Sequence, residues 1–179
     1  LLYSTVFHAA SNVDLQTRGL AVDGTGRAHI TGLGRGAGLP VVNAFMDTFP
    51  PDASSSFGRL GSFLAVFDPS QSGSASLVYS TFLGAGDVED VAVDTNGRSV
   101  VAGTTSSRTF PVTAGAFDTV CDDFISSGGS NLGCLADAFV MLFDPSLAGA
   151  ASLVAATRLG GARVEAGNGV ALDSDNNVL

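Results

Sequence analysis

The chain has 179 residues, of which 45% are hydrophobic and 14% charged, and it carries a net charge of −9. The hydrophobic content is enough for a folded core and excludes a chain that is disordered throughout. All 8 basic residues are Arg, which excludes lysine chemistry, and the acidic balance argues against nucleic-acid binding. No apolar stretch approaches the roughly 18–20 residues of a membrane-spanning helix.

The chain opens with a segment that recurs twice. Residues 1–7 begin with LLYST, which returns as LVYST at Leu77–Thr81 and as LVAAT at Leu153–Thr157, 76 positions apart each time. A fixed period of this length indicates a repeated structural unit. We therefore expect residues 1–7 to form an outer strand that lacks the rest of its own unit.

Two hairpins are predicted in each repeat. The first covers Gly19–Gly32 and is echoed by Asp90–Gly103, with short apolar strands flanking an Asp-x-x-Gly turn. The second covers Ser62–Phe82 and is echoed by Ala138–Arg158, where an apolar strand ends in Asp-Pro-Ser. Two hairpins make four antiparallel strands, which is the blade unit of a β-propeller. A β-sandwich is the alternative, but it does not explain the repeat.

These segments assemble into an all-β fold, a partial β-propeller of about two full blades with incomplete ends. The first blade covers 19–82 and the second 90–158, and an incomplete blade follows at 169–179. Propellers close with roughly four to eight blades, so this number cannot form a ring. Because the blades are too few to close, the chain is expected either to be an excerpt of a longer chain or to be completed by neighbouring copies. We favour the excerpt, since exposed strand edges are normally avoided.

The second repeat resembles the SBBP-type β-propeller repeat of bacterial secreted and surface proteins. The matching stretches, in the family's order, are VYSTFLG at Val78–Gly84, VAVDTNGRSVVAG at Val91–Gly103, FPVTAGAF at Phe110–Phe117 and DAFVMLFDPS at Asp137–Ser146. The first repeat departs from this pattern at Leu39 and at Gly61, which replaces the Asp of the DAFV motif. The resemblance implies a propeller fold and a surface location, and it brings no catalytic residues.

The two cysteines, Cys121 and Cys134, lie in a loop that is five residues longer in the second repeat. We predict a disulfide between them, in an oxidising compartment. Two free buried thiols are the alternative, although a polar Gly/Ser/Asn-rich loop is a poor place to bury them. A metal site is disfavoured because no further Cys and no nearby His offers another ligand.

Other candidate sites are weaker. Asp173, Asp175 and Asn177 resemble the start of a calcium loop but lack its later Gly and Glu, so a hairpin turn is favoured over a calcium site. Beyond this calcium no cofactor is expected. His8 and His29 are interpreted as non-catalytic, and the acidic run at residues 87–90 as a solvated loop before a strand.

The sequence thus favours a non-enzymatic structural or adhesive protein of the cell surface or extracellular space. Its expected partners are copies of itself, in a head-to-tail ring or filament, or the remaining blades of a longer chain. The alternative is a fragment of a propeller enzyme or a glycan- or protein-binding module whose functional residues lie on other blades.

Overall fold

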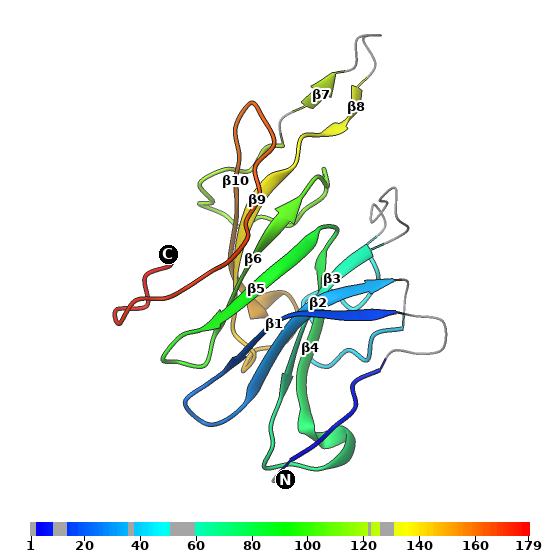
Figure 1. The fold of residues 1–179 in the computed structure, drawn as a ribbon, viewed down its shortest axis with the longest axis vertical. Helices are drawn as coiled ribbons and strands as arrows, with labels where there is room; N and C mark the ends of the chain where they lie inside the picture. Colours follow the sequence, from blue (N-terminus) through cyan, green and yellow to red (C-terminus); the bar gives the residue numbers. More distant parts are fainter. Residues whose placement is uncertain (1–2, 9–13, 36–37, 51–59, 122, 126–130) are drawn as a thin grey trace.

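The computed structural model describes residues 3–8, 14–35, 38–50, 60–121, 123–125 and 131–179. It contains two four-stranded antiparallel sheets, a two-stranded hairpin and two 3-10 helices of four residues each (Figure 1). The fold is therefore all-β, as predicted. In the part of the chain that is described, no helix is long and apolar enough to cross a membrane.

The two sheets share one strand plan. The first sheet has the order β1 (Leu15–Val22), β2 (Ala28–Arg35), β3 (Leu60–Phe67) and β4 (Leu77–Gly84). The second sheet has the order β5 (Asp87–Val93), β6 (Ser99–Thr105), β9 (Asp137–Phe143) and β10 (Leu153–Leu159). Helix η1 (Gly73–Ser76) precedes β4 and helix η2 (Gly149–Ser152) precedes β10. The hairpin of β7 (Asp123–Ile125) and β8 (Asn131–Cys134) is inserted between β6 and β9.

The turn between the first two strands of a unit has the same construction three times. A carboxylate oxygen of Asp23 accepts the backbone N–H groups two and four residues later, and Asp94 and Asp173 do the same. The fourth turn position is Gly26, Gly97 or Asn176, and each has a positive φ. Glycine adopts this backbone without strain, and asparagine tolerates it better than most residues. The segment 169–179 therefore forms a third such hairpin, joined by the bridge between Leu172 and Val178.

The core lies between the two sheets. Side chains of β9 alternate, with Phe139, Met141 and Phe143 buried against the first sheet and the residues between them half-buried. From the first sheet, Leu64 and Val66 of β3 and Tyr79 of β4 meet them. This period of two is typical of a strand that presents one face to a core.

The two sheets approach most closely at β1 and β5, which lie side by side (Figure 1). A Cβ atom on Gly19 would come 2.9 Å from the backbone nitrogen of Val91 and 3.1 Å from the carbonyl carbon of Asp90. These distances are too short for a side chain, so the close approach requires glycine here.

Two expected features differ in the structure. Residues 3–7 of the predicted outer strand 1–7 are not assigned to a strand, although Phe7 packs on Phe63 and Phe67 with ring centroids 5.8 and 5.4 Å away. Ladder bonds need a neighbouring strand, and the sheets of the described residues do not include this segment. The acidic run 87–90 is the start of strand β5 and is not a loop.

Candidate docking groove on the second sheet

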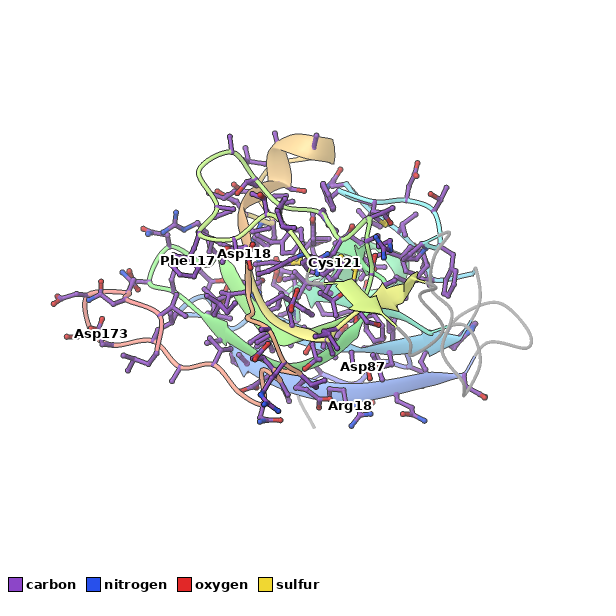
Figure 2. All side chains as sticks on the ribbon, turned by 90° about the horizontal axis from the view of Figure 1, so that it is seen from above. Arg18, Asp87, Phe117, Asp118, Cys121 and Asp173 are labelled. Carbon is purple, nitrogen blue, oxygen red and sulfur yellow. A yellow bond between two sulfur atoms is a disulfide. The ribbon has the colours of Figure 1, made fainter. Side chains whose placement is uncertain are left out.

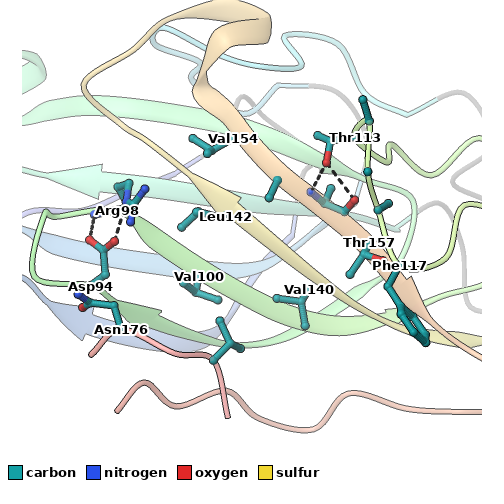
Figure 3. Close-up of a pocket in the computed structure, with 16 residues that line it drawn as sticks. Asp94, Arg98, Val100, Thr113, Phe117, Val140, Leu142, Val154, Thr157 and Asn176 are labelled. Atoms are coloured by element: carbon teal, nitrogen blue, oxygen red, sulfur yellow. Dashed lines mark hydrogen bonds and ion pairs between the residues drawn. The ribbon is translucent and has the colours of Figure 1, made fainter. Parts of the chain in front are cut away.

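A groove of about 340 Å³ lies on the face of the second sheet that points away from the first sheet (Figure 3). We call this face the far face of the second sheet and the cavity the outer groove. Its apolar floor comes from β6, β9 and β10, one wall from residues 113–117, and one end from the turns at residues 94–98 and 176–178. The floor residues are Val100, Val140, Leu142 and Val154.

The floor of the outer groove has a buried counterpart in the first sheet. Val140 and Leu142 lie 76 positions after Leu64 and Val66, on the equivalent strand and face. Leu64 and Val66 are fully buried because the second sheet covers them, whereas Val140 and Leu142 are only half-buried. The outer groove is therefore equivalent to the surface of the first sheet that the second sheet covers.

The wall of the groove repeats a connection of the first sheet. In the first sheet, Met46 donates its N–H to the Thr81 hydroxyl and accepts the N–H of Phe82. In the second sheet, Asp118 donates its N–H to the Thr157 hydroxyl and accepts the N–H of Arg158. The residues before Met46 and Asp118 are phenylalanines, Phe45 and Phe117, so the hydrogen bonds place these two side chains in equivalent positions.

The two phenylalanines have opposite surroundings. Phe45 reaches across to the second sheet, where its ring lies 6.0 Å from that of Phe143 in an edge-to-face contact. Phe117 is 83% exposed and stands at the rim of the outer groove (Figures 2 and 3). A large exposed aromatic side chain beside an apolar groove is typical of a surface that binds another apolar surface.

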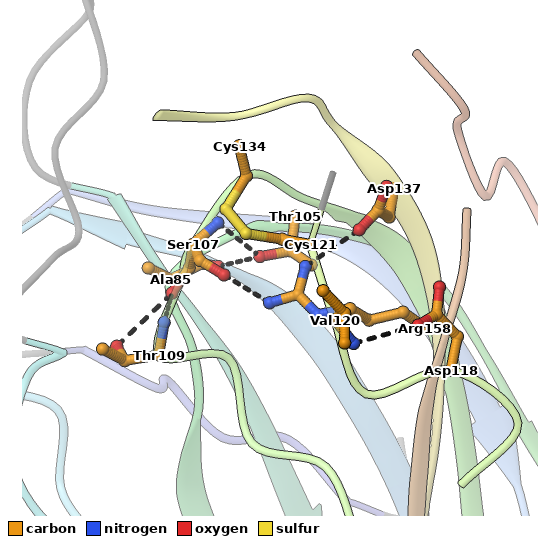
Figure 4. The surroundings of a disulfide bond; sticks show 10 residues. All are labelled: Ala85, Thr105, Ser107, Thr109, Asp118, Val120, Cys121, Cys134, Asp137 and Arg158. Atoms are coloured by element: carbon orange, nitrogen blue, oxygen red, sulfur yellow. Dashed lines mark hydrogen bonds and ion pairs between the residues drawn. A yellow bond between two sulfur atoms is a disulfide. The ribbon is translucent and has the colours of Figure 1, made fainter. Parts of the chain in front are cut away.

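The predicted disulfide is confirmed. Cys121 and Cys134 are bonded, with their Cα atoms 5.5 Å apart, and they close the base of the β7–β8 insertion (Figure 4). Cys121 comes shortly after the groove wall of residues 113–117, so the bond ties the inserted hairpin to the end of that wall.

A buried ion pair lies next to the disulfide and was missed in the sequence. The Arg158 guanidinium donates to the Asp137 carboxylate at 3.0 Å, donates to the carbonyl of Ser107, and stands 5.5 Å from the centre of the Phe110 ring (Figure 4). In the first repeat the counterparts, 76 positions earlier, are Phe82 and Gly61. Both members of the pair are therefore replaced together. That joint replacement is the signal that could have revealed the pair, because a buried carboxylate needs its cation.

His29 joins the two sheets. Its Nδ1 lies 2.7 Å from the Ser99 hydroxyl of β6 and its Nε2 lies 3.4 Å from the carboxylate of Asp23. Burial lowers the pKa of His29, and Asp23 only partly opposes this effect. Burial also acts to raise the pKa of Asp23, but hydrogen bonds, chiefly from Thr25 and Arg27, outweigh it and lower that pKa to about 2. His29 thus belongs to the interface between the sheets.

The residues of the predicted calcium site, Asp173, Asp175 and Asn177, share the third turn, which projects from the body of the molecule (Figure 2). Both carboxylate oxygens of Asp173 accept hydrogen bonds within the turn, and the bonds from Asn177 and Asp175 lower the pKa of Asp173. Among the described residues, no group of three or more His, Cys, Asp or Glu could hold a metal ion. Calcium binding at these three residues stays a prediction, and calorimetric titration with calcium would test it.

Comparison of the chain with models of known protein families and with curated proteins finds no match. The functional inference therefore starts from the outer groove and from its equivalence to a covered surface of the first sheet. An apolar floor with an exposed aromatic rim is suited to binding another apolar surface.

Proposed function

We propose that the chain is a non-enzymatic scaffold of the cell surface or extracellular space, a partial β-propeller whose sheets stack face to face. The observation that carries this proposal is the contrast between two equivalent surfaces. Leu64 and Val66 of the first sheet are covered by the second sheet, while Val140 and Leu142 of the second sheet form an open groove. A module with this arrangement can add a further sheet by the contacts it already uses internally.

The strand plan supports a propeller. Each sheet is a four-stranded meander, and the first strands of the two sheets, β1 and β5, are neighbours. In a propeller the first strand of each blade lines the central channel, so consecutive first strands lie side by side. Closure takes about four blades or more, and these are supplied by further copies, in a head-to-tail ring or filament, or by further blades of a longer chain.

The extracellular location is supported by the disulfide. Bonds such as Cys121–Cys134 persist in oxidising compartments and are rare in the cytosol. The net charge of −9 would also keep such a protein in solution against non-specific association.

Electron microscopy of the native material, with immunogold labelling of the cells that make the protein, tests the proposal. We expect label outside the cell envelope and particles that are rings or filaments. Label confined to the cell interior, or single-chain particles that form neither a ring nor a filament, would contradict the scaffold function.

A further inference from the structure

The far face of the second sheet is covered only over its inner half. Residues 167–179 run across this half, where Gly167 donates its N–H to the Thr104 hydroxyl and Val170 donates its N–H to the Asp90 carboxylate. The turns also meet, because Thr95 and Asn176 exchange two hydrogen bonds of 3.0 and 2.9 Å. The outer half of the same face is the outer groove, with Leu142 on its floor.

The opposite end of the molecule is covered in the reverse way. On the face of the first sheet that points away from the second, Phe7 covers the outer half by packing on Phe63 and Phe67. The inner half is open, and Leu20 of β1 is 63% exposed. Its counterpart in the second sheet, Val91, lies 71 positions later and is buried between the sheets.

The two ends therefore complement each other. The far face of the second sheet is open over its outer half and carries a hairpin over its inner half. The opposite face of the molecule, on the first sheet, carries residues 3–8 over its outer half and leaves Leu20 exposed over its inner half. The repeat also assigns the positions, because Tyr3–Phe7 correspond to Tyr79–Leu83 of β4, 76 positions later.

Residues 3–8 have features of a segment that is not yet fully enclosed. Val6 is 83% exposed, although Phe7 beside it packs on the first sheet. The Tyr3 hydroxyl is buried and has no hydrogen-bond partner among the described residues, whereas its counterpart Tyr79 bonds to Ser152 at 2.9 Å. Burying a hydroxyl without a hydrogen-bond partner is unfavourable, so residues 3–8 are not fully stabilised by their contacts with the first sheet.

We propose that residues 3–8 of a second copy of this chain occupy the outer groove, with Val6 against Leu142 and Phe117. In the same contact, the hairpin around Leu172 and Val178 of the first copy covers Leu20 of the second. The contact joins two different surfaces and therefore continues from copy to copy. This inference rests on the scaffold function proposed above and names the surfaces that the scaffold uses.

Sedimentation velocity of the full chain over a concentration series tests the inference. Two groove variants, Leu142→Asp and Phe117→Ser, and one segment variant, Val6→Asp, are compared with the wild type. The control is Val164→Asp, which introduces the same charge at a valine that is 68% exposed and lies outside both surfaces. Unfolding by heat establishes that each variant is folded, and Phe117→Ser replaces a side chain that the fold leaves exposed.

We expect the wild type and Val164→Asp to associate with rising concentration, and the other variants to associate about tenfold or more weakly. An equimolar mixture of Val6→Asp and Leu142→Asp has one intact pair of surfaces, so it should form dimers that do not grow. If the groove and segment variants associate as strongly as the wild type, or if the mixture stays monomeric, the inference is overturned but the scaffold function is not. A wild type that stays monomeric at every concentration overturns the inference, and with it the assembly by copies on which it rests.

Discussion

The hydroxyl of Tyr79 lies 2.9 Å from the hydroxyl of Ser152 and joins the outer strand of the first sheet to helix η2 of the second. Ser152 already donates its hydrogen to the carbonyl of Gly149 at 2.7 Å, so Tyr79 is the donor in this contact. Burial raises the pKa of Tyr79, which keeps the hydroxyl in its donating form. The bond fixes the two sheets at their outer edge, as His29 and Ser99 fix them nearer the turns.

Tyr79→Phe should therefore lower the free energy of unfolding by about 1 kcal/mol, because it removes one buried hydrogen bond and leaves the ring in place. Denaturant unfolding measures the change. Tyr3→Phe is the matched control, because the Tyr3 hydroxyl has no partner in the described part of the chain, and it should cost nothing measurable. Equal losses in both variants would show that the Tyr79–Ser152 bond contributes no stability.

Arg158→Phe should be strongly destabilising, by about 3–5 kcal/mol, because it leaves the buried Asp137 carboxylate without its cation. The first repeat contains the compensated alternative, Gly61 with Phe82. The double variant Asp137→Gly with Arg158→Phe should therefore recover most of the loss in a denaturant unfolding series. If the double variant is as unstable as Arg158→Phe alone, Gly and Phe at these two positions cannot replace the ion pair in the second repeat.

Replacing both cysteines, Cys121→Ser with Cys134→Ser, should lower the free energy of unfolding by up to about 3 kcal/mol. The reason is that the bond restricts the conformations of the unfolded chain between the two cysteines. Titration of thiols in denaturant should find none in the wild type before reduction. After reduction, the stability of the wild type should fall to that of the double variant. A thiol count that reductant does not change would refute the bond, and equal stability of reduced and oxidised protein would show that the bond does not stabilise the fold.

The stability of the molecule should fall as the pH drops below about 6.5, the ordinary pKa of histidine. Burial lowers the pKa of His29 in the folded state, so the unfolded chain binds the proton more readily and acid favours unfolding. Denaturant unfolding at pH 7, 6 and 5 measures this slope. Asp23 acts in the same direction but at lower pH, because its folded pKa is about 2.

His29→Gln is the variant that tests this assignment, since glutamine does not titrate. Its unfolding free energy should change less than that of the wild type between pH 7 and 5. The assignment fails if the slope of the wild type survives in His29→Gln.

The hairpins could be predicted from the sequence because their turns carry strong local signals. The Asp and Gly positions at Asp23–Gly26 recur at Asp94–Gly97, and the structure places a hairpin at each. The disulfide could also be predicted, since the chain has only two cysteines and a Gly/Ser-rich sequence separates them. The β7–β8 hairpin was not predicted, because its Gly/Ser-rich sequence shows no apolar alternation.

The contacts between the sheets could not be read from local patterns. His29 was interpreted only as a packed or surface residue, because its partner Ser99 lies 70 positions away. The Arg158–Asp137 pair forms across neighbouring strands, and charged residues in a strand are ordinarily exposed. The open groove also required the structure, because the apolar sequence around Leu142 matches that around the buried Val66.

Intermolecular cross-linking determines whether residues 3–8 of one copy occupy the outer groove of the next. Chains carrying Val6→Cys and Leu142→Cys are mixed and oxidised, and the products are mapped by mass spectrometry. We expect a dimer linked between positions 6 and 142, formed well above the level seen when Val164→Cys replaces Leu142→Cys. A yield no greater than that of the Val164→Cys mixture would show that residues 3–8 do not bind in the groove.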